Sequence, residues 1–427
     1  VYTEKGLNAE IGVRDSIALG TSSCVSCGQC TLVCPVGALA VKDDTEKVLD
    51  YLYDPKVTTV FQIAPAVRVA LGEEFKMKPG TPVIGKVVTA LKRMGADYVL
   101  DTNFTADLVI MEEGSELLER VNHGGKLPLL TSCSPGWINF MEKYYPEVRE
   151  HVSSVKSPQQ CFGVLAKTYF AQKVGINPRF MKVVSIMPCT AKKVEAARPE
   201  FNTMGKPDVD VVLTTREFAR LLKREGIWLP DLPETAYEDL WMDNYSGAAE
   251  LFGATGGVME AALRTVYKIV KGTELEGIEI SDVRGPEKIK EATIDLGGKY
   301  GKVKVAVAHG LKAARRIVED IRDGKSPYVF VEIMACPNGC IGGGGQPRTK
   351  GNYQAFREER REAIYGLDRS HAIRQSHNNP MIKRIYEDFL GEPLSSKSHH
   401  LLHTAYSDRK KKTIHPIKEI WEEIQAI

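Results

Sequence analysis

The 427-residue sequence lacks long apolar runs, an excess of one charge, internal repeats and low-complexity segments. No stretch reaches the roughly 18 uninterrupted apolar residues of a transmembrane helix, which argues against a membrane span. The formal net charge of +2 argues against an extended nucleic-acid-binding surface. The chain begins at Val1 with neither an initiator Met nor an apolar signal region, so we expect residues upstream of it.

Nucleotide-binding fingerprints are absent as well. Gly342–Gly345 is not followed by the Lys-Ser/Thr of a P-loop, and Gly253-Ala-Thr-Gly-Gly does not fit the dinucleotide fingerprint. Any NAD(P) chemistry would therefore belong to a partner subunit. Because the glycine run begins two residues after Cys340, close approach of the backbone to a cofactor is the better interpretation.

Cysteine is the informative residue that is present. The nine cysteines fall in tight groups rather than a dispersed even set; they are Cys24, Cys27, Cys30, Cys34, Cys133, Cys161, Cys189, Cys336 and Cys340. In a long chain without an export signal, clustered thiols indicate metal ligands rather than disulfides. We therefore expect a reducing, cytoplasmic compartment.

From about residue 57, short apolar runs alternate with amphipathic stretches, which predicts an α/β fold with mainly parallel sheets flanked by helices. The predicted helices include Ala106–Val121, Thr215–Glu225 and Gly257–Val270. The predicted buried strands are Val57–Ala64, Tyr98–Leu100, Leu127–Leu130, Lys182–Met187, Val209–Leu213, Val303–Ala308 and Tyr328–Met334. We expect a ferredoxin-like iron–sulfur domain at residues 1–55, a catalytic domain at 56–390 and a helical tail at 391–427.

Three cysteines distant in sequence follow predicted strands. Cys133, Cys189 and Cys336 each stand just after a strand, beside Pro or Gly. The carboxyl ends of parallel strands line the ligand crevice of an open α/β sheet, so these loops are expected to converge on one site.

The segment Cys24-Val-Ser-Cys27-Gly-Gln-Cys30-Thr-Leu-Val-Cys34-Pro35 has the spacing of bacterial ferredoxins and predicts a 4Fe–4S cluster. In two-cluster ferredoxins the fourth cysteine of such a run binds the other cluster. Either Cys34 completes its own cluster, or it serves a second one whose remaining ligands lie upstream.

Three further segments carry a family resemblance: Thr131-Ser-Cys-Ser-Pro-Gly-Trp137, Met187-Pro-Cys-Thr-Ala-Lys-Lys-Val-Glu195, and Glu332-Ile-Met-Ala-Cys-Pro-Asn-Gly-Cys340 with the glycines after it. In order and spacing they resemble the three signature motifs of iron-only (FeFe) hydrogenases. The resemblance covers nearly the whole chain from about Gly6. It implies a two-lobed catalytic domain and an H-cluster, a 4Fe–4S cubane bridged to a diiron unit with carbonyl, cyanide and an amine dithiolate.

The resemblance also implies residue roles. Cys189, Cys336 and Cys340 match cubane ligands, with Cys340 as the bridge to the diiron unit. Cys133 matches the cysteine that passes protons to the amine, and Lys192 the lysine that hydrogen-bonds a cyanide. The residues implied to contact the cofactor also include Pro65, Gln159, Met187 and Met334, and those implied to relay protons to the surface are Glu113, Ser153, Glu116 and Arg120.

Residue chemistry supports two of these roles independently. A lysine such as Lys192 can donate up to three hydrogen bonds to an anionic ligand. Glu113 and Glu116 stand three residues apart, on one face of a predicted helix. Carboxylates on an inward face are costly unless they move protons or pair with a residue such as Arg120.

The sequence departs from the family pattern at Ser134, where the family has a cubane-ligand cysteine. Ser134 could bind iron through oxygen, a harder ligand than thiolate. Alternatively, Cys133 could shift to bind iron, or Cys161 could substitute for the missing thiol. A second departure is Ala66, where the family often has a serine that donates to a cyanide.

The function predicted from these features is reversible hydrogen chemistry, 2H⁺ + 2e⁻ ⇌ H₂. The resemblance implies ferredoxin, a flavin or NAD(P) subunit, or a formate-oxidising subunit as the redox partner. The alternative, favoured by Ser134, is a non-catalytic relative that relays electrons or senses hydrogen.

Overall fold

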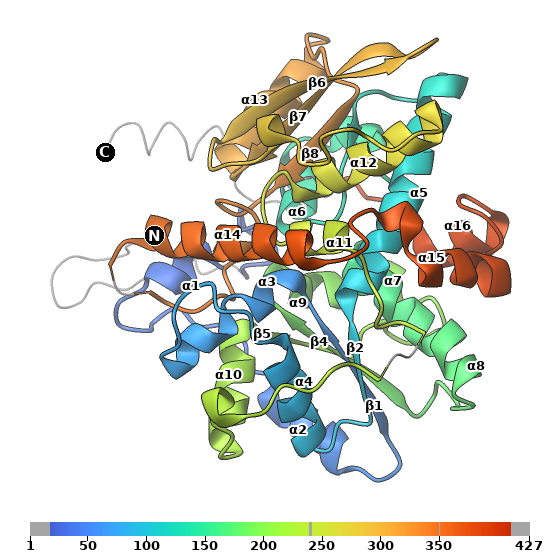
Figure 1. Cartoon of the computed structure of the whole chain (residues 1–427). Coiled ribbons are helices and arrows are strands. Elements are labelled where there is room, and N and C mark those ends of the chain that lie inside the picture. Colours follow the sequence, from blue (N-terminus) through green and yellow to red (C-terminus); the bar gives the residue numbers. More distant parts are fainter. Residues whose placement is uncertain (1–17, 239–240, 350, 411–427) are drawn as a thin grey trace, which may run out of the picture.

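Two four-stranded sheets organise the part of the chain that the structure, a computed structural model, describes: residues 18–238, 241–349 and 351–410. The first sheet is parallel throughout, in the order β2-β1-β4-β5, with β1 (Thr58–Ile63), β2 (Tyr98–Asp101), β4 (Met181–Met187) and β5 (Val211–Thr214). The second has the order β3-β8-β7-β6, with β3 (Leu129–Leu130), β6 (Ile289–Gly297), β7 (Gly301–His309) and β8 (Phe330–Met334). Only β6 runs antiparallel to its neighbour in this sheet. The sheets form the lower and upper parts of the molecule in Figure 1.

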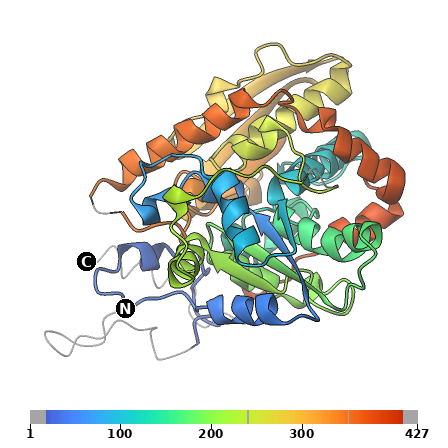
Figure 2. The ribbon, with the colours of Figure 1, turned by 60° about the horizontal axis from the view of Figure 1, so that its bottom comes forward.

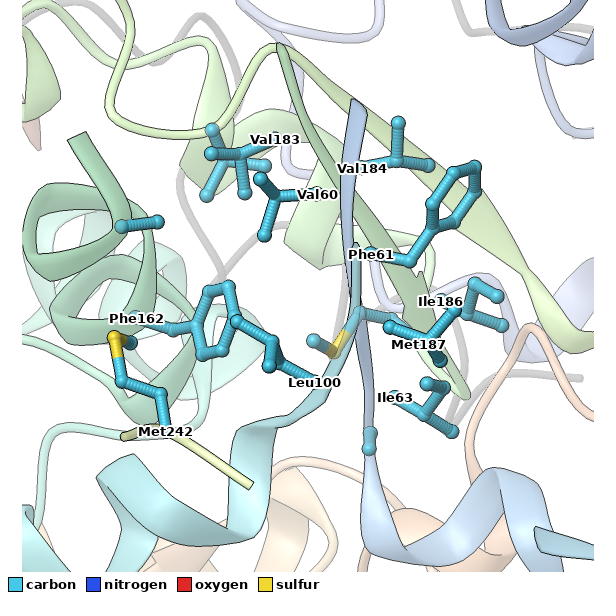
Figure 3. Packing of buried hydrophobic residues seen from close by; sticks show 14 of the residues in the cluster. Val60, Phe61, Ile63, Leu100, Phe162, Val183, Val184, Ile186, Met187 and Met242 are labelled. Carbon is cyan, nitrogen blue, oxygen red and sulfur yellow. The ribbon is translucent and has the colours of Figure 1, made fainter. Parts of the chain in front are cut away.

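Both faces of the first sheet are apolar and buried. The register places Val60 beside Val183 and Phe61 beside Val184, so successive pairs point to opposite faces. Figure 3 shows Val60 and Val183 on one side of the strands and Phe61 and Val184 on the other. Parallel sheets of this kind are covered by helices on both sides, which explains the nearly continuous apolar runs in these strands.

The side chains of β7 also point alternately to the two faces of the second sheet. Val305 and Val307 pack against α12 (Gly257–Lys271). The alternate residues, Ala306 and Ala308, pack against α6 and α13. The period of two along one strand thus gives each face its own helix layer.

The helices of the described residues are α1 (Gln29–Val33), α2 (Thr45–Tyr53), α3 (Pro65–Arg68), α4 (Ile84–Arg93), α5 (Thr102–His123), α6 (Pro135–Tyr144), α7 (Pro158–Leu165), α8 (Ala171–Lys173), α9 (Ala191–Ala196), α10 (Thr215–Arg224), α11 (Gly247–Leu251), α12, α13 (Leu311–Arg322), α14 (Tyr353–Ser370), α15 (Pro380–Ile385) and α16 (Ser396–Leu402). Helix α14 crosses the molecule between the two sheets, and α15 and α16 lie beside α5 and α7 (Figure 1). Among the described helices, none combines the length and apolar character that crossing a membrane requires.

The α/β fold predicted from sequence is confirmed, and all seven predicted strands are present. Strand β6 was not predicted from the sequence, because charged residues such as Lys290 and Glu291 interrupt its apolar residues and leave no apolar run. The predicted domain limits stay predictions. Residues 1–17 and 411–427, which belong to the predicted first domain and tail, lie outside the described residues.

A buried ion-pair network joins the first sheet to α11. The guanidinium of Arg68, which is fully buried, donates to both carboxylate oxygens of Asp101 at 2.9 Å. Its other nitrogen donates to Glu250 and to the Tyr245 hydroxyl, both at 2.8 Å. Because two carboxylates share this cation in a dry environment, its removal leaves Asp101 without its ion-pair partner and Glu250 with only the His371 imidazole, 3.5 Å away. Arg68 stands two residues after Ala66, so the network fixes the loop that follows β1.

We predict that Arg68→Ala lowers the free energy of unfolding by about 3–5 kcal/mol, the usual cost of breaking a buried ion pair from one side. Arg220→Ala is the matched control, because Arg220 pairs with Asp43 at 2.8 Å with both side chains about half exposed; it should cost less than about 1 kcal/mol. Anaerobic unfolding followed by circular dichroism measures both. Equal losses in the two variants would contradict the prediction.

Candidate active site and cluster-binding loops

A largely apolar cavity lies where the carboxyl ends of the two sheets meet. The loops that follow β1, β3, β4 and β8 all contribute to its wall. The loops predicted to converge therefore do so, for the reason given by strand direction. The cavity wall contains every residue that was predicted to contact the cofactor or its cubane: Pro65, Cys133, Ser134, Gln159, Met187, Cys189, Lys192, Met334, Cys336 and Cys340.

Glycines allow two of these loops to touch. A Cβ atom on Gly343 would lie 2.3 Å from the carbonyl oxygen of Pro188, and one on Gly345 would lie 2.9 Å from the carbonyl carbon of Pro188. Only residues without a side chain fit so close to another backbone. The glycine run thus holds the loop of Cys336 and Cys340 against the loop of Cys189.

The cavity thiols are poorly solvated. Burial raises the pKa of Cys133, Cys189 and Cys336, and raises the pKa of Cys340 to about 12. The ammonium of Lys192 acts in the opposite direction on the pKa of Cys133, Cys189 and Cys340. Several thiols in one dry space are costly as thiolates unless a cation balances them.

Lys192 is held at the cavity wall by the carboxylate of Glu195, a residue that was not predicted from the sequence. Its Nζ lies 2.9 Å from Glu195 Oε2, three residues along α9. The same oxygen accepts hydrogen bonds from Ser157 and Gln159, each at 3.0 Å. The spacing of three on one helix could have revealed Glu195 as the partner of Lys192.

The four predicted relay residues form a line from the cavity wall to the surface. Glu113 lies beside the Ser153 hydroxyl and the Ser132 N–H, and it influences the pKa of the neighbouring Cys133. Ser153 also lies 2.7 Å from Glu116 Oε2, and Arg120 donates to Glu116 Oε1 at 2.6 Å. Glu113 is 2% exposed and Glu116 8% exposed, whereas Arg120 reaches solvent. Burial and the charge of Glu116 raise the pKa of Glu113 to about 8.

The structure shows where two candidates for the missing cubane ligand, Ser134 and Cys161, lie. Ser134 lines the cavity, and its Oγ accepts a hydrogen bond from the Ala335 N–H at 3.2 Å. Cys161 is fully buried in the core of the first sheet, where its thiol donates to the Lys156 carbonyl at 3.4 Å, and it is not part of the cavity wall. Cys161 is thus not brought to the site.

The N-terminal cysteine loop packs directly on the cavity loops. Gln29 donates to the Gly342 carbonyl at 2.8 Å, and a Cβ atom on Gly344 would lie 2.2 Å from the Cys27 carbonyl oxygen. The thiol of Cys27 is close enough to Cys336 to influence its pKa. From the other side, Lys143 Nζ donates to the carbonyls of Gly20, Ser22 and Cys24.

Cys34 has different surroundings from the other N-terminal cysteines. The thiol of Cys27 lies near those of Cys24 and Cys30. Cys34 instead faces the backbone N–H groups of residues 36–39, with that of Leu39 foremost, and they lower its pKa. Backbone donors of this kind stabilise a thiolate without another thiol beside it.

The donors at both places fit iron–sulfur groups. Thiolates are the soft ligands that hold such clusters, and the cavity offers four thiols, an ammonium and two thioethers around a large apolar space. Among the described residues, no three His, Cys, Asp or Glu side chains are grouped tightly enough for a single metal ion.

We predict that Glu113 is protonated at neutral pH, because its pKa is raised to about 8. Infrared difference spectra should show a carboxyl C=O band that disappears near that pH and is absent from Glu113→Gln. Between the ordinary pKa and about 8 the folded chain binds more protons than the unfolded chain, so this group makes stability fall as pH rises through that window. Glu119→Gln, an exposed change on the same helix, should keep the band. A band that persists in Glu113→Gln would contradict the assignment.

Three family models match the chain. The C-terminal domain of the iron-only hydrogenase large subunit matches residues 57–344, the iron hydrogenase small subunit matches residues 354–409, and a 4Fe–4S binding domain matches residues 19–40. The predicted 4Fe–4S segment around Cys24–Cys34 is thereby confirmed.

Relatives match over most of this chain. The NADP-reducing hydrogenase subunit HndD of Solidesulfovibrio fructosivorans is 46% identical, over 95% of this chain and 70% of its own length. Iron hydrogenase 1 of Clostridium pasteurianum is 40% identical, over 87% of this chain and 65% of its own length. Protein NAR1 of Arabidopsis thaliana is 31% identical, over 92% of this chain and 86% of its own length.

A solved structure gives the same result. A variant of the [FeFe]-hydrogenase HydA1 from Chlamydomonas reinhardtii superposes with a TM-score of 0.76 at 41% identity, over 86% of this chain and 99% of that one. With the large-subunit model covering residues 57–344 and the cavity geometry described above, the chain belongs to the iron-only (FeFe) hydrogenase large-subunit family.

Proposed function

We propose that the protein catalyses the reversible reaction 2H⁺ + 2e⁻ ⇌ H₂. The observation that carries the proposal is the buried line of Cys133, Glu113, Ser153, Glu116 and Arg120, which leads from the thiol-lined cavity to the surface. A protein that only relays electrons does not need such a line. Buried carboxylates are costly, so their presence beside a cofactor cavity favours proton transfer.

The cavity residues would hold an H-cluster. Cys189, Cys336 and Cys340 would hold the iron of this group, and Ser134 would stand in for the fourth ligand. Met187, Met334, Pro65 and Gln159 would pack around the diiron unit. When bound, this group supplies the hydrogen chemistry and stores the electrons, while the protein supplies ligation, orientation and exclusion of water.

The chain's own residues would move the protons. Glu116, held near the surface by its hydrogen bond from Arg120, receives a proton from solvent, Ser153 passes it between the two carboxylates, and Glu113 delivers it to Cys133. A pKa of about 8 keeps Glu113 in its proton-carrying form at neutral pH. Lys192, fixed by Glu195, would donate hydrogen bonds from Nζ to an anionic ligand in the cavity.

We also propose that a redox partner supplies the electrons. The N-terminal cysteine loop touches the cavity loops through Gly344, so a cluster held there stands next to the active cavity. The name of the relative HndD favours an NADP-linked partner subunit over ferredoxin or a formate-oxidising subunit. Cys34, apart from the other thiols, would serve a second cluster. All nine cysteines are free thiols, which supports a reducing, cytoplasmic compartment.

The alternative is a non-catalytic relative that relays electrons or senses hydrogen. Ser134 in place of a thiol favours it, because oxygen is a harder ligand for a cluster. The intact relay and the Lys192–Glu195 pair favour the enzyme.

Infrared absorption of anaerobically matured protein tests the proposed function. We expect carbonyl and cyanide stretching bands that shift on exposure to hydrogen, because the cavity can hold the diiron unit. An iron-replete protein without these bands would overturn the proposal and favour the non-catalytic alternative.

We predict that Ser134→Ala weakens the cubane, converting it to a three-iron cluster on oxidation, because an oxygen ligand is lost. Ser134→Cys should keep the four-iron cluster and resist this conversion, since thiolate is the softer ligand. Iron analysis and electron paramagnetic resonance report both without an activity assay. Cys161→Ala is the control and should leave the cluster intact. A stable four-iron cluster in Ser134→Ala would show that Ser134 is not a ligand.

A further inference from the structure

The segment matching the small-subunit model ends against the proton line, at a buried carboxylate that the proposed mechanism does not use. Glu112, on α5 beside Glu113, is fully buried. It accepts hydrogen bonds from four donors of the C-terminal segment: Tyr386 Oη (2.6 Å), Leu394 N (3.0 Å), Ser398 Oγ (2.5 Å) and His403 Nε2 (3.1 Å). Burial alone would raise its pKa, but the bonds from His403, Ser398 and Tyr386 outweigh burial and hold the pKa of Glu112 below its usual value. Glu112 is therefore an ionised anchor for this segment.

His403 has a second contact on its other side. Since ionised Glu112 can only accept, Nε2 of His403 carries the proton of that bond. Its Nδ1 lies 2.8 Å from the Ser154 hydroxyl. In the neutral ring, Nδ1 accepts the hydroxyl proton of Ser154, so the imidazole bridges Glu112 and Ser154.

Ser154 in turn holds a member of the proton line. Its backbone N–H donates to both carboxylate oxygens of Glu116 at 3.2 Å. The same stretch is paired to the C-terminal segment, because Thr404 N donates to the Ser154 carbonyl and Lys156 N to the Leu402 carbonyl, each at 2.7 Å. Residues 153 and 154 both hydrogen-bond Glu116, and the backbone that carries them is paired with the C-terminal segment.

The other ionisable groups around His403 are on three elements. His399 stacks on its ring, with the ring centroids 4.1 Å apart. Glu112 of α5 accepts from His403 Nε2, and Tyr386 donates to the same carboxylate from the residues after α15. Glu112 and Glu116 also act on the pKa of the stacked His399. His399 is exposed, so the stack connects the buried bridge with solvent.

We propose that His403 is a positioning residue for proton transfer: by bridging Glu112 and Ser154, it fixes Glu116 in line with Ser153 and Glu113. The segment of residues 354–409, which matches the small-subunit model, would then position Glu116 for proton transfer in addition to packing against the rest of the chain. The expected effect of His403 on catalysis rests on the proposed function. The expected effect of His403 on Glu116 and Glu113 does not.

The test compares His403→Ala with His400→Ala, an exposed change in α16, the helix that ends just before His403. With a chemical electron donor, His403→Ala should evolve hydrogen roughly tenfold more slowly, less than the loss of about 10²-fold or more expected when a group that itself transfers the proton is removed. Its solvent isotope effect should rise, while its iron content and carbonyl and cyanide bands stay as in the parent. His400→Ala should match the parent in every respect.

The second readout is the C=O band of Glu113, which needs no diiron unit. The charge of Glu116 helps to raise the pKa of Glu113, so displacement of Glu116 should move the midpoint of this band to lower pH in His403→Ala. The double variant with Glu113→Gln identifies the band, because Glu112 could gain a carboxyl band of its own when His403 is lost. Ser154→Ala, which removes only the hydroxyl, should shift the midpoint in the same direction by less, and it serves if His403→Ala does not fold.

The outcomes separate the two proposals. A parent protein without carbonyl and cyanide bands overturns the proposed function, and the Glu113 midpoint still tests the role of His403. A His403→Ala protein with a lowered melting temperature but an unchanged midpoint and unchanged isotope effect would mean that His403 only stabilises the core, and would overturn the inference.

Discussion

Charge balance in a dry space is the constraint on which the rest of this structure depends. The cavity gathers four thiols and one lysine from loops of both sheets, with little water to solvate any of them. Thiolates can persist there only beside a cation, which iron supplies in a cluster. The parallel strands make this gathering possible, because the loops at their carboxyl ends bring distant cysteines to one edge of each sheet.

The same constraint separates two neighbouring carboxylates on α5. Glu112 has four hydrogen-bond donors, which lower its pKa despite burial. Glu113 has fewer donors and the charge of Glu116 nearby, so its pKa rises to about 8. Successive residues on a helix point in directions about 100° apart, so each samples a different environment. One residue becomes a fixed anchor and the other a carrier of protons.

Close backbone contacts assemble the site from three parts of the chain. Gly344 lies against the carbonyl of Cys27, and Gly343 and Gly345 lie against Pro188. A side chain at any of these positions would push the N-terminal loop or the loop of Cys189 away from the cavity. On the far side, the C-terminal segment closes on Glu112 through His403. The cavity therefore depends on contacts between segments that are far apart in the sequence.

The sequence by itself determined the element types, the strand ends that carry Cys133, Cys189 and Cys336, and the iron–sulfur character of the chain. These follow from local periodicity and from spacing, which act over a few residues. The sequence did not predict β6, because charged residues interrupt its apolar ones. It also did not place Cys161, since a lone thiol carries no spacing signal. Only the tertiary structure decided that Glu195 holds Lys192, that Glu112 and Glu113 differ in protonation, and that His403 reaches Ser154, 249 residues away. Such pairings depend on burial and on contacts between distant segments, which no local pattern records.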